Sequence, residues 1–393
     1  MRKILSLTGN EAVGEAIRQL EPDVVAAYPI TPQTELMERF AQYVADGKVQ
    51  TEFVLVESEH SAMSASIGAS LAGARSMTAT SANGLALMWE VLYVASGNRC
   101  PIVMAVVSRA LSGPINIHCD HSDSMGARDT GWIQLFSESA QEAYDNMIQA
   151  TKISESQDVL LPTMVMLDGF ITSHTADRVE VLDDAEVKKF VGEFRRKYSV
   201  IDVDNPATFG ALDLQDYYFE HKRQVAEAVS QSTKRILSVS EEYGKLTGRK
   251  MALFESYRMD DAETGIIVLG STAGTVKVVV DELRAEGKKV GMIKLRVFRP
   301  FPGDLLASSI SHLKAVAVLD RSHTFGGPGG PVFTEVRASA YGKVRNVPII
   351  NYVYGLGGRD ISIGDIKNVY KELEGIGKAG EPLTRFEFLG VRE

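Results

Sequence analysis

The chain has 393 residues and a formal net charge of −9 at pH 7, with 45% hydrophobic and 24% charged residues. This composition is typical of a globular protein, and the length exceeds what one hydrophobic core usually serves, so we expect two or three domains. The acidic balance argues against a nucleic-acid or anionic-membrane surface, because either would need clustered Lys and Arg.

Cysteine content and hydropathy exclude further classes of protein. The two cysteines, Cys100 and Cys119, are too few for an iron–sulfur cluster, which takes about four thiolates, and too few for a secreted disulfide scaffold. Any electron-transfer cluster must therefore lie on another chain. The N-terminus has no secretory-signal pattern, and the longest apolar runs, such as residues 102–107, fall far short of the ~20 residues that span a bilayer. We expect a cytoplasmic protein.

Short apolar runs alternate with helical patterns over residues 1–235. The runs are continuous or rich in β-branched residues, as strands covered on both faces should be. The expected strands are residues 24–28, 53–56, 76–80, 102–107 and 163–167. The expected helices are residues 10–20, 34–45, 59–71, 84–95 and 139–154. This alternation predicts an α/β fold whose doubly wound, mostly parallel sheet carries helices on both sides.

Charge-rich helical patterns at residues 183–198 and 218–245 break the alternation, and we interpret residues 236–260 as a connector. A second, smaller α/β domain is expected over residues 261–393. Its expected strands are residues 265–270, 289–296, 315–319 and 349–353, and its expected helices are residues 271–286 and 302–311.

Polar and glycine-rich segments follow several of the expected strands. They are Tyr28-Pro-Ile-Thr-Pro32, Glu57-Ser-Glu-His60, Thr80-Ser-Ala-Asn-Gly84, Ser108-Arg-Ala-Leu-Ser-Gly113, His118-Cys-Asp-His-Ser-Asp123, Leu167-Asp-Gly-Phe170, Arg296-Val-Phe-Arg-Pro-Phe-Pro302 and Tyr354-Gly-Leu-Gly-Gly-Arg-Asp360. No one of these motifs is decisive, but their order and spacing along the whole chain resemble the alpha subunits of the pyruvate-type 2-oxoacid:ferredoxin oxidoreductases.

The resemblance implies a fold, an activity and partners. The family oxidatively decarboxylates a 2-oxoacid, here pyruvate, on thiamine diphosphate, passes electrons to ferredoxin and transfers the acyl group to coenzyme A. The expected domains are a pyrimidine-binding thiamine-diphosphate domain (residues 1–235) and a transketolase C-terminal-like domain (residues 261–393). Thiamine diphosphate would be shared with a beta-type subunit that holds Mg²⁺. Gamma- and delta-type subunits would supply [4Fe-4S] clusters, and this chain would hold no metal.

Thiamine becomes a nucleophile when a protein carboxyl group hydrogen-bonds its aminopyrimidine ring and helps to remove a proton from the thiazolium carbon. The resemblance assigns this role to Glu59, which follows the apolar run 53–56 and begins a helix rich in small residues. Glu57 is the rival candidate. Alternatively, both carboxylates only complement the positive end of the helix dipole.

The resemblance places Thr31 and Arg109 at the substrate. Thr31 lies in a turn that Pro29 and Pro32 restrict, although it could instead cap the helix that starts near residue 34. Arg109 follows a buried strand, where an unpaired charge is costly, and its guanidinium can hold a carboxylate through two parallel hydrogen bonds. The alternative role of Arg109 is a structural salt bridge to Asp120 or Asp123.

Other candidate residues surround these positions. Pro29, Ser81 and Asn83 are expected to line the cofactor site, although a turn between strand and helix is a weak signal. The residues His118, Asp120, His121 and Asp123 are of metal-ligand type, but we interpret them as a polar loop near the substrate, with Cys119 as a bystander thiol. The segment Gly270-Ser-Thr-Ala-Gly274 could bind a phosphate, yet it lacks the full dinucleotide fingerprint, so a packing role is expected.

Three alternatives remain open at this point. The same chemistry could act on 2-oxoglutarate, a branched-chain 2-oxoacid or oxalate. The chain could be a non-catalytic scaffold subunit of such a complex. It could also perform a transketolase-like group transfer without redox partners.

Overall fold

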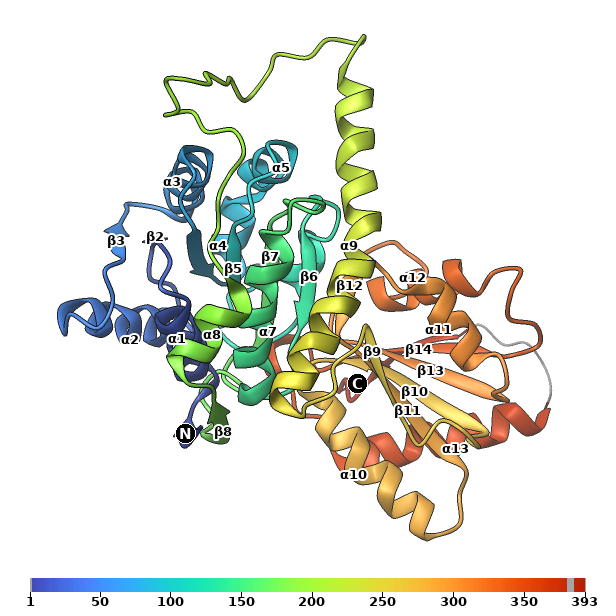
Figure 1. Cartoon of the computed structure of the whole chain (residues 1–393). Coiled ribbons are helices and arrows are strands. Elements are labelled where there is room, and N and C mark those ends of the chain that lie inside the picture. Colours follow the sequence, from blue (N-terminus) through green and yellow to red (C-terminus); the bar gives the residue numbers. More distant parts are fainter. Residues whose placement is uncertain (1, 380–384, 393) are drawn as a thin grey trace.

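The computed structural model describes residues 2–379 and 385–392. Two α/β units lie side by side, each built on a mostly parallel sheet with helices against its faces (Figure 1). The long helix α9 (Tyr218–Thr247) runs beside the first unit and leads into the second. The predicted fold class is therefore confirmed.

The first sheet has seven strands in the described residues. In spatial order they are β12 (Val297–Arg299), β6 (Ile133–Phe136), β7 (Thr163–Asp168), β5 (Val103–Ser108), β4 (Ser76–Thr80), β2 (Val24–Ala27) and β3 (Glu52–Leu55). All neighbours are parallel except β12, which pairs antiparallel with β6. Strands β4, β5, β6 and β7 are buried along their whole length, which explains their continuous apolar sequences.

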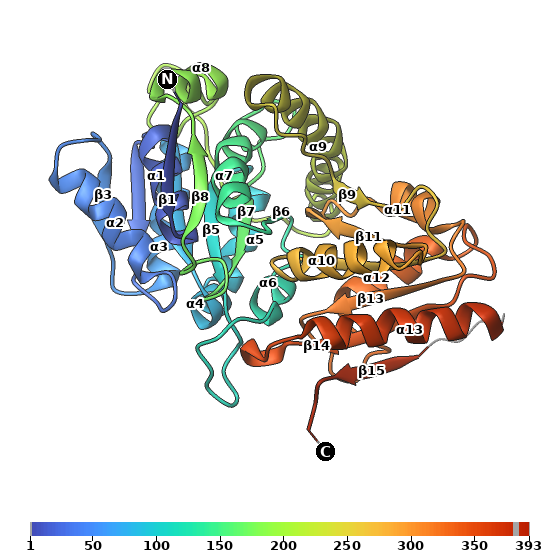
Figure 2. The ribbon, with the colours of Figure 1, turned by 90° about the horizontal axis from the view of Figure 1, so that it is seen from below.

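Helices cover both faces of this sheet. They are α1 (Gly9–Leu20), α2 (Thr34–Ala45), α3 (Glu59–Ala72), α4 (Ala82–Leu87), α5 (Trp89–Gly97), α6 (Ser122–Gly126), α7 (Ala140–Ser154) and α8 (Asp184–Val191). Helix α1 begins with a capping box between Thr8 and Glu11, and α7 begins at a Ser139 cap. A two-stranded ribbon of β1 (Lys3–Leu7) and β8 (Asp177–Val181) lies beside α1 and α7 (Figure 2).

The second unit has six described strands. Their spatial order is β15 (Phe386–Leu389), β14 (Ile349–Tyr354), β13 (Ala315–Asp320), β10 (Thr264–Leu269), β11 (Val290–Leu295) and β9 (Phe254–Tyr257). One face packs against α10 (Thr272–Ala285) and α13 (Ile363–Ala379) (Figure 2). The other face, with α11 (Gly303–Ile310) and α12 (Pro331–Ala340), shares a continuous hydrophobic core with the first unit.

The structure corrects several element predictions. The expected helix over residues 84–95 is two helices that meet at Met88, and the expected helix over residues 183–198 ends at Val191 because Gly192 has a φ of 79°. Strands β1, β6, β8, β9, β12 and β15 and helices α6, α12 and α13 were not predicted from the sequence. The predicted domain limits stay a prediction, since α9 passes through residue 235 as one helix.

Among the described residues, every helix is too short or too polar to span a lipid bilayer.

A buried carboxylate at the end of β7 joins the two units. Asp168 accepts hydrogen bonds from the Arg321 guanidinium (3.1 Å) and from the backbone N–H of Ser271 (3.0 Å), both in the second unit, and lies 2.9 Å from His121 Nε2. Burial alone would raise the pKa of Asp168, but the neighbouring His121 and Arg321 hold it well below its usual range. The interface therefore depends on an ionised carboxylate that is fully paired.

We expect the substitution Asp168→Asn to lower the free energy of unfolding by about 3–5 kcal/mol, because it leaves the buried Arg321 cation without its counter-charge. Urea unfolding of the full chain would measure this change. Asp158→Asn is the matched control: Asp158 pairs with Arg235 in a largely exposed position, so its loss should cost less than about 1 kcal/mol. Equal effects of the two variants would contradict the role given to Asp168.

Candidate active site

The predicted site residues come together at one edge of the first sheet. Strands β2, β3, β4 and β5 are parallel, so the segments that follow them meet at the same edge. The segment after β2 carries Pro29 and Thr31, α3 after β3 begins at Glu59, α4 after β4 contains Asn83, and Arg109 follows β5. The topology thus assembles a site from four segments that are distant in sequence.

Glu59 is buried at the start of α3, with 6% of its surface exposed. Its position is set by Gly84 of α4: a Cβ atom at residue 84 would lie 2.7 Å from Glu59 Oε1 and would also collide with the Thr80 hydroxyl. No hydrogen bond or ion pair from the described part of the chain holds the Glu59 carboxylate. A buried carboxylate without a partner is costly, so this group is available for a ligand.

Glu57 has a different environment from Glu59. Its side chain is exposed and accepts a hydrogen bond from the Ser61 hydroxyl, which lowers the pKa of Glu57. Glu57 therefore supports the first turn of α3 from outside, whereas Glu59 faces the sheet edge. The structure separates two carboxylates that the sequence left as rivals.

Three buried hydroxyl groups at this edge of the sheet lack a hydrogen-bond partner among the described residues: those of Thr80, Ser81 and Ser108. They stand at the ends of β4 and β5, and Ser81 precedes α4. Buried polar groups in folded proteins are nearly always hydrogen-bonded. These three hydroxyl groups are therefore available to bind a polar ligand, such as the aminopyrimidine ring of thiamine. Ser81 was predicted; Thr80 and Ser108 were missed, and buried hydroxyls that end apolar strands were the available signal.

Asp123 fastens the two strand ends to each other. Its carboxylate accepts hydrogen bonds from the backbone N–H groups of Ala82 (3.0 Å), Arg109 (3.0 Å) and Ser124 (2.6 Å). Burial raises the pKa of Asp123 to about 7 in spite of these three donors. Because it holds Ala82 and Arg109 together, Asp123 is a positioning residue, and the sequence had suggested only a polar loop here.

Arg109 is buried, with 7% of its surface exposed, and it has no carboxylate partner among the described residues. Its Nη1 donates to the Thr31 carbonyl oxygen (2.9 Å) and its Nε to the Asn116 carbonyl oxygen (3.0 Å). Asp123 binds the backbone of Arg109 and not its guanidinium. The predicted alternative of a salt bridge to Asp120 or Asp123 is therefore wrong, and the positive charge of Arg109 remains uncompensated.

The remaining predicted residues lie at the open side of the edge. Thr31 and Pro29 are exposed, and Thr31 does not cap α2, whose N-cap is Gln33 without a side-chain hydrogen bond. Asn83 is exposed, and its Oδ1 accepts hydrogen bonds from the backbone N–H and hydroxyl of Ser112 (both 3.2 Å). Asn83 thereby ties α4 to the loop that follows Arg109.

The loop of His118, Asp120 and His121 contacts the second unit. Asp120 accepts a hydrogen bond from the Gly357 N–H (3.2 Å), and a Cβ at Gly358 would collide with His118. Cys119, His121 and Asp168 are close enough to bind one metal ion, but the Arg321 cation already contacts Asp168. Burial also raises the pKa of the Cys119 thiol well above its usual value. We therefore interpret the group as a structural contact between the units.

The N-terminus of α10, at Ser271, binds a carboxylate of the protein itself. Its backbone N–H and its hydroxyl both donate to Asp168 (3.0 and 2.6 Å), and Gly270 lies directly against the same carboxylate. The dipole of α10 therefore faces a protein anion, which agrees with the packing role predicted for this segment.

Comparisons with solved structures identify the fold. Solved structures with the same fold include a 2-oxoglutarate:ferredoxin oxidoreductase from Magnetococcus marinus (TM-score 0.74, 23% identity) and a split-gene transketolase (TM-score 0.53, 12% identity). Each comparison covers 95% of this chain, with 65% of the first structure's chain and 98% of the second. These two structures therefore share the α/β fold of this chain.

Sequence comparisons define the family. Residues 15–241 match the thiamine-diphosphate-binding domain of pyruvate flavodoxin/ferredoxin oxidoreductases, and residues 262–366 match core domain II of pyruvate:ferredoxin oxidoreductases. A pyruvate synthase subunit PorA of Thermotoga maritima is 54% identical over 99% of this chain and 98% of that protein. The corresponding subunit of Methanocaldococcus jannaschii is 46% identical over 95% and 96%. The chain belongs to the pyruvate:ferredoxin oxidoreductase family, as its motifs indicated.

We expect Gly84→Ala to displace Glu59 and to lower the free energy of unfolding by about 1–3 kcal/mol, because the added methyl group has no space between Glu59 and Thr80. Urea unfolding of the full chain measures the effect. Gly375→Ala in α13 is the control, since nothing lies within 4 Å of a Cβ there, and the change should stabilise the helix by up to about 1 kcal/mol. Effects of the same sign would argue against the close packing of Gly84.

Proposed function

We propose that this chain is the alpha subunit of a cytoplasmic pyruvate:ferredoxin oxidoreductase. Together with beta-, gamma- and delta-type subunits it would catalyse the reversible oxidative decarboxylation of pyruvate to acetyl-coenzyme A and CO₂, with the electrons passed to ferredoxin. The observation that carries the proposal is the buried, unpaired Glu59 carboxylate at the open edge of a domain that matches a thiamine-diphosphate-binding family.

Bound thiamine diphosphate would supply the nucleophilic carbon and the electron sink for decarboxylation. Glu59 would hydrogen-bond the pyrimidine ring from the protein side, as the unpaired state of its carboxylate supports. The hydroxyl groups of Thr80, Ser81 and Ser108 would bind the same ligand, since each is buried at this edge without a partner among the described residues. Pro29 and Asn83 would complete its rim.

Large apolar side chains near this edge support the proposal that another subunit covers the site. Leu55 at the end of β3 is 66% exposed, and Ile115 in the loop after Arg109 is 78% exposed. Apolar groups gathered around a polar site are typical of a protein interface. We infer that the beta-type subunit, with the diphosphate and Mg²⁺, docks against these residues.

Arg109 and Thr31 would bind the substrate. The Arg109 guanidinium has a fixed position, because two backbone carbonyl groups hold Nε and Nη1, and its Nη2 has no hydrogen-bond partner in the described residues. A buried, uncompensated cation favours an anionic ligand, and the carboxylate of a 2-oxoacid fits this requirement. The Thr31 hydroxyl lies in the same turn that Arg109 anchors, so it could bind the same ligand.

Pyruvate is the favoured substrate because relatives named pyruvate synthase include the 54% identical protein of Thermotoga maritima. A ketoisovalerate oxidoreductase subunit VorA of Pyrococcus horikoshii is 41% identical over 97% of the chain and 96% of that protein. A branched-chain 2-oxoacid is therefore the second candidate. Turnover of the assembled complex with both acids separates the two, and preference for the branched acid would displace pyruvate.

We expect Glu59→Gln to preserve assembly of the complex but to reduce pyruvate-dependent ferredoxin reduction by about 10²–10⁴-fold, because the amide cannot supply the carboxyl group's proton chemistry. Steady-state rates of the purified complex would measure this loss.

Glu57→Gln is the matched control for Glu59→Gln, since Glu57 lies two residues away and is exposed. Its turnover should stay near that of the wild type. Unchanged turnover in the Glu59 variant would favour a scaffold role for the chain, and a loss confined to the Glu57 variant would reverse the assignment of the two carboxylates.

We expect Arg109→Lys to raise the KM for pyruvate by about tenfold or more with a smaller change in kcat, because an ammonium group cannot make the paired hydrogen bonds of a guanidinium. Arg128→Lys is the control, since Arg128 also binds a backbone carbonyl, that of Met125 (2.7 Å), but lies outside the site. A normal KM together with a lowered melting temperature would assign Arg109 to loop anchoring alone.

A further inference from the structure

A cleft of about 1010 Å³ lies between α5, the start of α9 and the segment 193–217, which we call the arm. The arm contains no helix or strand and projects beyond the first unit before it reaches α9 (Figure 1). It is anchored below its tip, where Val200 N–H donates to the Leu71 carbonyl (3.0 Å) and Gly210 N–H donates to Asn98 Oδ1 (3.0 Å). The cleft is thus a defined cavity under a fastened segment.

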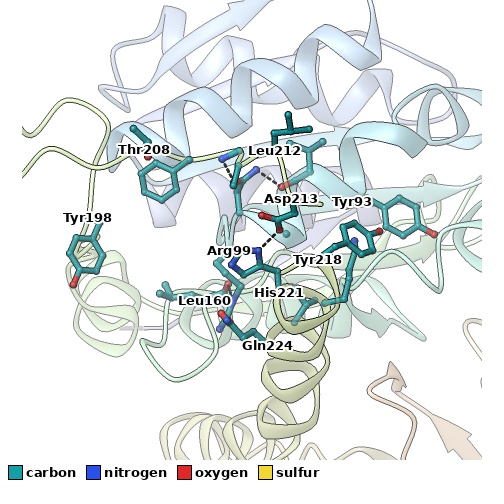
Figure 3. Close-up of a pocket in the computed structure, with 18 of the residues that line it drawn as sticks. Tyr93, Arg99, Leu160, Tyr198, Thr208, Leu212, Asp213, Tyr218, His221 and Gln224 are labelled. Carbon is teal, nitrogen blue, oxygen red and sulfur yellow. Dashed lines mark hydrogen bonds and ion pairs between the residues drawn. The ribbon is translucent and has the colours of Figure 1, made fainter. Parts of the chain in front are cut away.

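The cleft and the proposed catalytic edge lie at opposite ends of the strands of the first sheet. Arg99 and Leu160, which line it, precede β5 and β7, whereas Arg109 and Asp168 stand at the opposite ends of these strands. The cleft is lined by Tyr198, Thr208 and Leu212 of the arm and by Tyr218, His221 and Gln224 of α9 (Figure 3). A ligand here would not occupy the thiamine site.

Four cations line this cleft: Arg99, Arg196, Lys197 and Lys222. None of them has a carboxylate within ion-pair distance in the parts of the chain that the structure describes. One acidic residue, Asp213, also lines the cleft, and it is already paired with His221. In a protein with a net charge of −9, this local excess of positive charge is unusual and favours an anionic ligand.

The two arginines are held close together without compensation. Arg196 donates through Nη1 to the Arg99 carbonyl oxygen (3.1 Å), through Nη2 to the Asn98 carbonyl oxygen (3.0 Å) and through Nε to the Tyr198 carbonyl oxygen (3.0 Å), so it contributes charge and holds Arg99 in place. Burial, and then the charge of Arg196, lower the pKa of Arg99. Arg99 uses Nε and Nη2 on the carbonyl groups of Leu160 and Val159, which leaves Nη1 as an available donor.

Aromatic rings stabilise these cations in place of carboxylates. The guanidinium of Arg196 lies 5.1 Å from the Phe209 ring, and the ammonium of Lys222 lies 5.5 Å from Tyr93 and 5.4 Å from Tyr218. Cation–π contacts hold the positive groups in position without neutralising their charge. The first turn of α9 begins at the cleft without a side-chain cap, so its dipole adds to the positive field.

We propose that this cleft binds a small phosphorylated anion, at a site separate from the catalytic edge. A polyphosphate group presents several oxygen acceptors and multiple negative charges. These match the free Nη1 of Arg99 and the ammonium groups of Lys197 and Lys222, with the added positive charge of Arg196, better than a single carboxylate does. The volume of the cavity suits a small molecule. The anion could be inorganic or could carry a nucleoside, whose base would contact the aromatic rings.

Calorimetric titration of the full-length chain with inorganic pyrophosphate and with ADP tests the proposal. We expect one site per chain for each probe, with binding that weakens as salt is added, because salt screens the charges. Tighter binding of ADP would identify a nucleotide-type ligand, and equal binding would identify a phosphate site. Absence of binding by both probes would overturn the proposal.

The variant Lys197→Ala/Lys222→Ala removes two cations that make no backbone contacts needed for folding. It should weaken pyrophosphate binding by about tenfold. Lys189→Ala/Lys234→Ala is the control, since both of these lysines are exposed and lie outside the cleft. An equal loss in the control would overturn the proposal. Loss of pyrophosphate binding when the chain is assembled with its partner subunits would also overturn it, because the cleft would then be a protein interface.

Discussion

The arrangement of the candidate site depends on one buried carboxylate, Asp168. It ends β7 in the first sheet and binds Arg321 and Ser271 of the second unit as well as His121 of the loop that follows Arg109. Because His121 is also fixed by its backbone N–H to the Arg321 carbonyl (2.8 Å), that loop cannot move without disturbing the contact between the units. The second unit thus orients the loop whose Asn116 carbonyl group holds the proposed substrate-binding cation, Arg109.

A second constraint acts from within the first unit. Gly84 lets α4 approach Glu59 more closely than any side chain would allow, and Asp123 ties the start of α4 to the end of β5. The proposed proton-handling carboxyl and the proposed substrate cation are therefore attached to one rigid group of strand ends. This rigidity is what a site needs when it must hold two ligands at a fixed distance.

The sequence predicted the elements that have a local signal, and it missed those that depend on contacts between residues far apart in the chain. Strands β4, β5 and β7 are buried on both faces, so their apolar sequences revealed them. Strand β12 has three residues and pairs with β6, which lies more than a hundred residues away in the chain, so no local pattern could reveal it. Glu57 was the rival of Glu59 in the sequence, and only the structure separates them, because Glu59 begins α3 against Gly84 of α4 whereas Glu57 is exposed. The role of Asp168 depends on contacts with the second unit, which no local motif encodes.

The buried arginines of the chain show how a structural cation differs from a binding one. Arg296 is buried, and all three of its nitrogens donate to protein acceptors, among them Asn146, Ser240 and Gln149; burial lowers its pKa to about 10. Its hydrogen bonds are satisfied inside the protein, so it can only support the core. Arg109 and Arg99 each keep one terminal nitrogen without a partner in the described residues, and each faces an open edge or cleft. By the same test Arg196 is a positioning cation, because all three of its nitrogens donate to backbone carbonyl groups. The free nitrogens of Arg109 and Arg99 therefore indicate two separate anion sites.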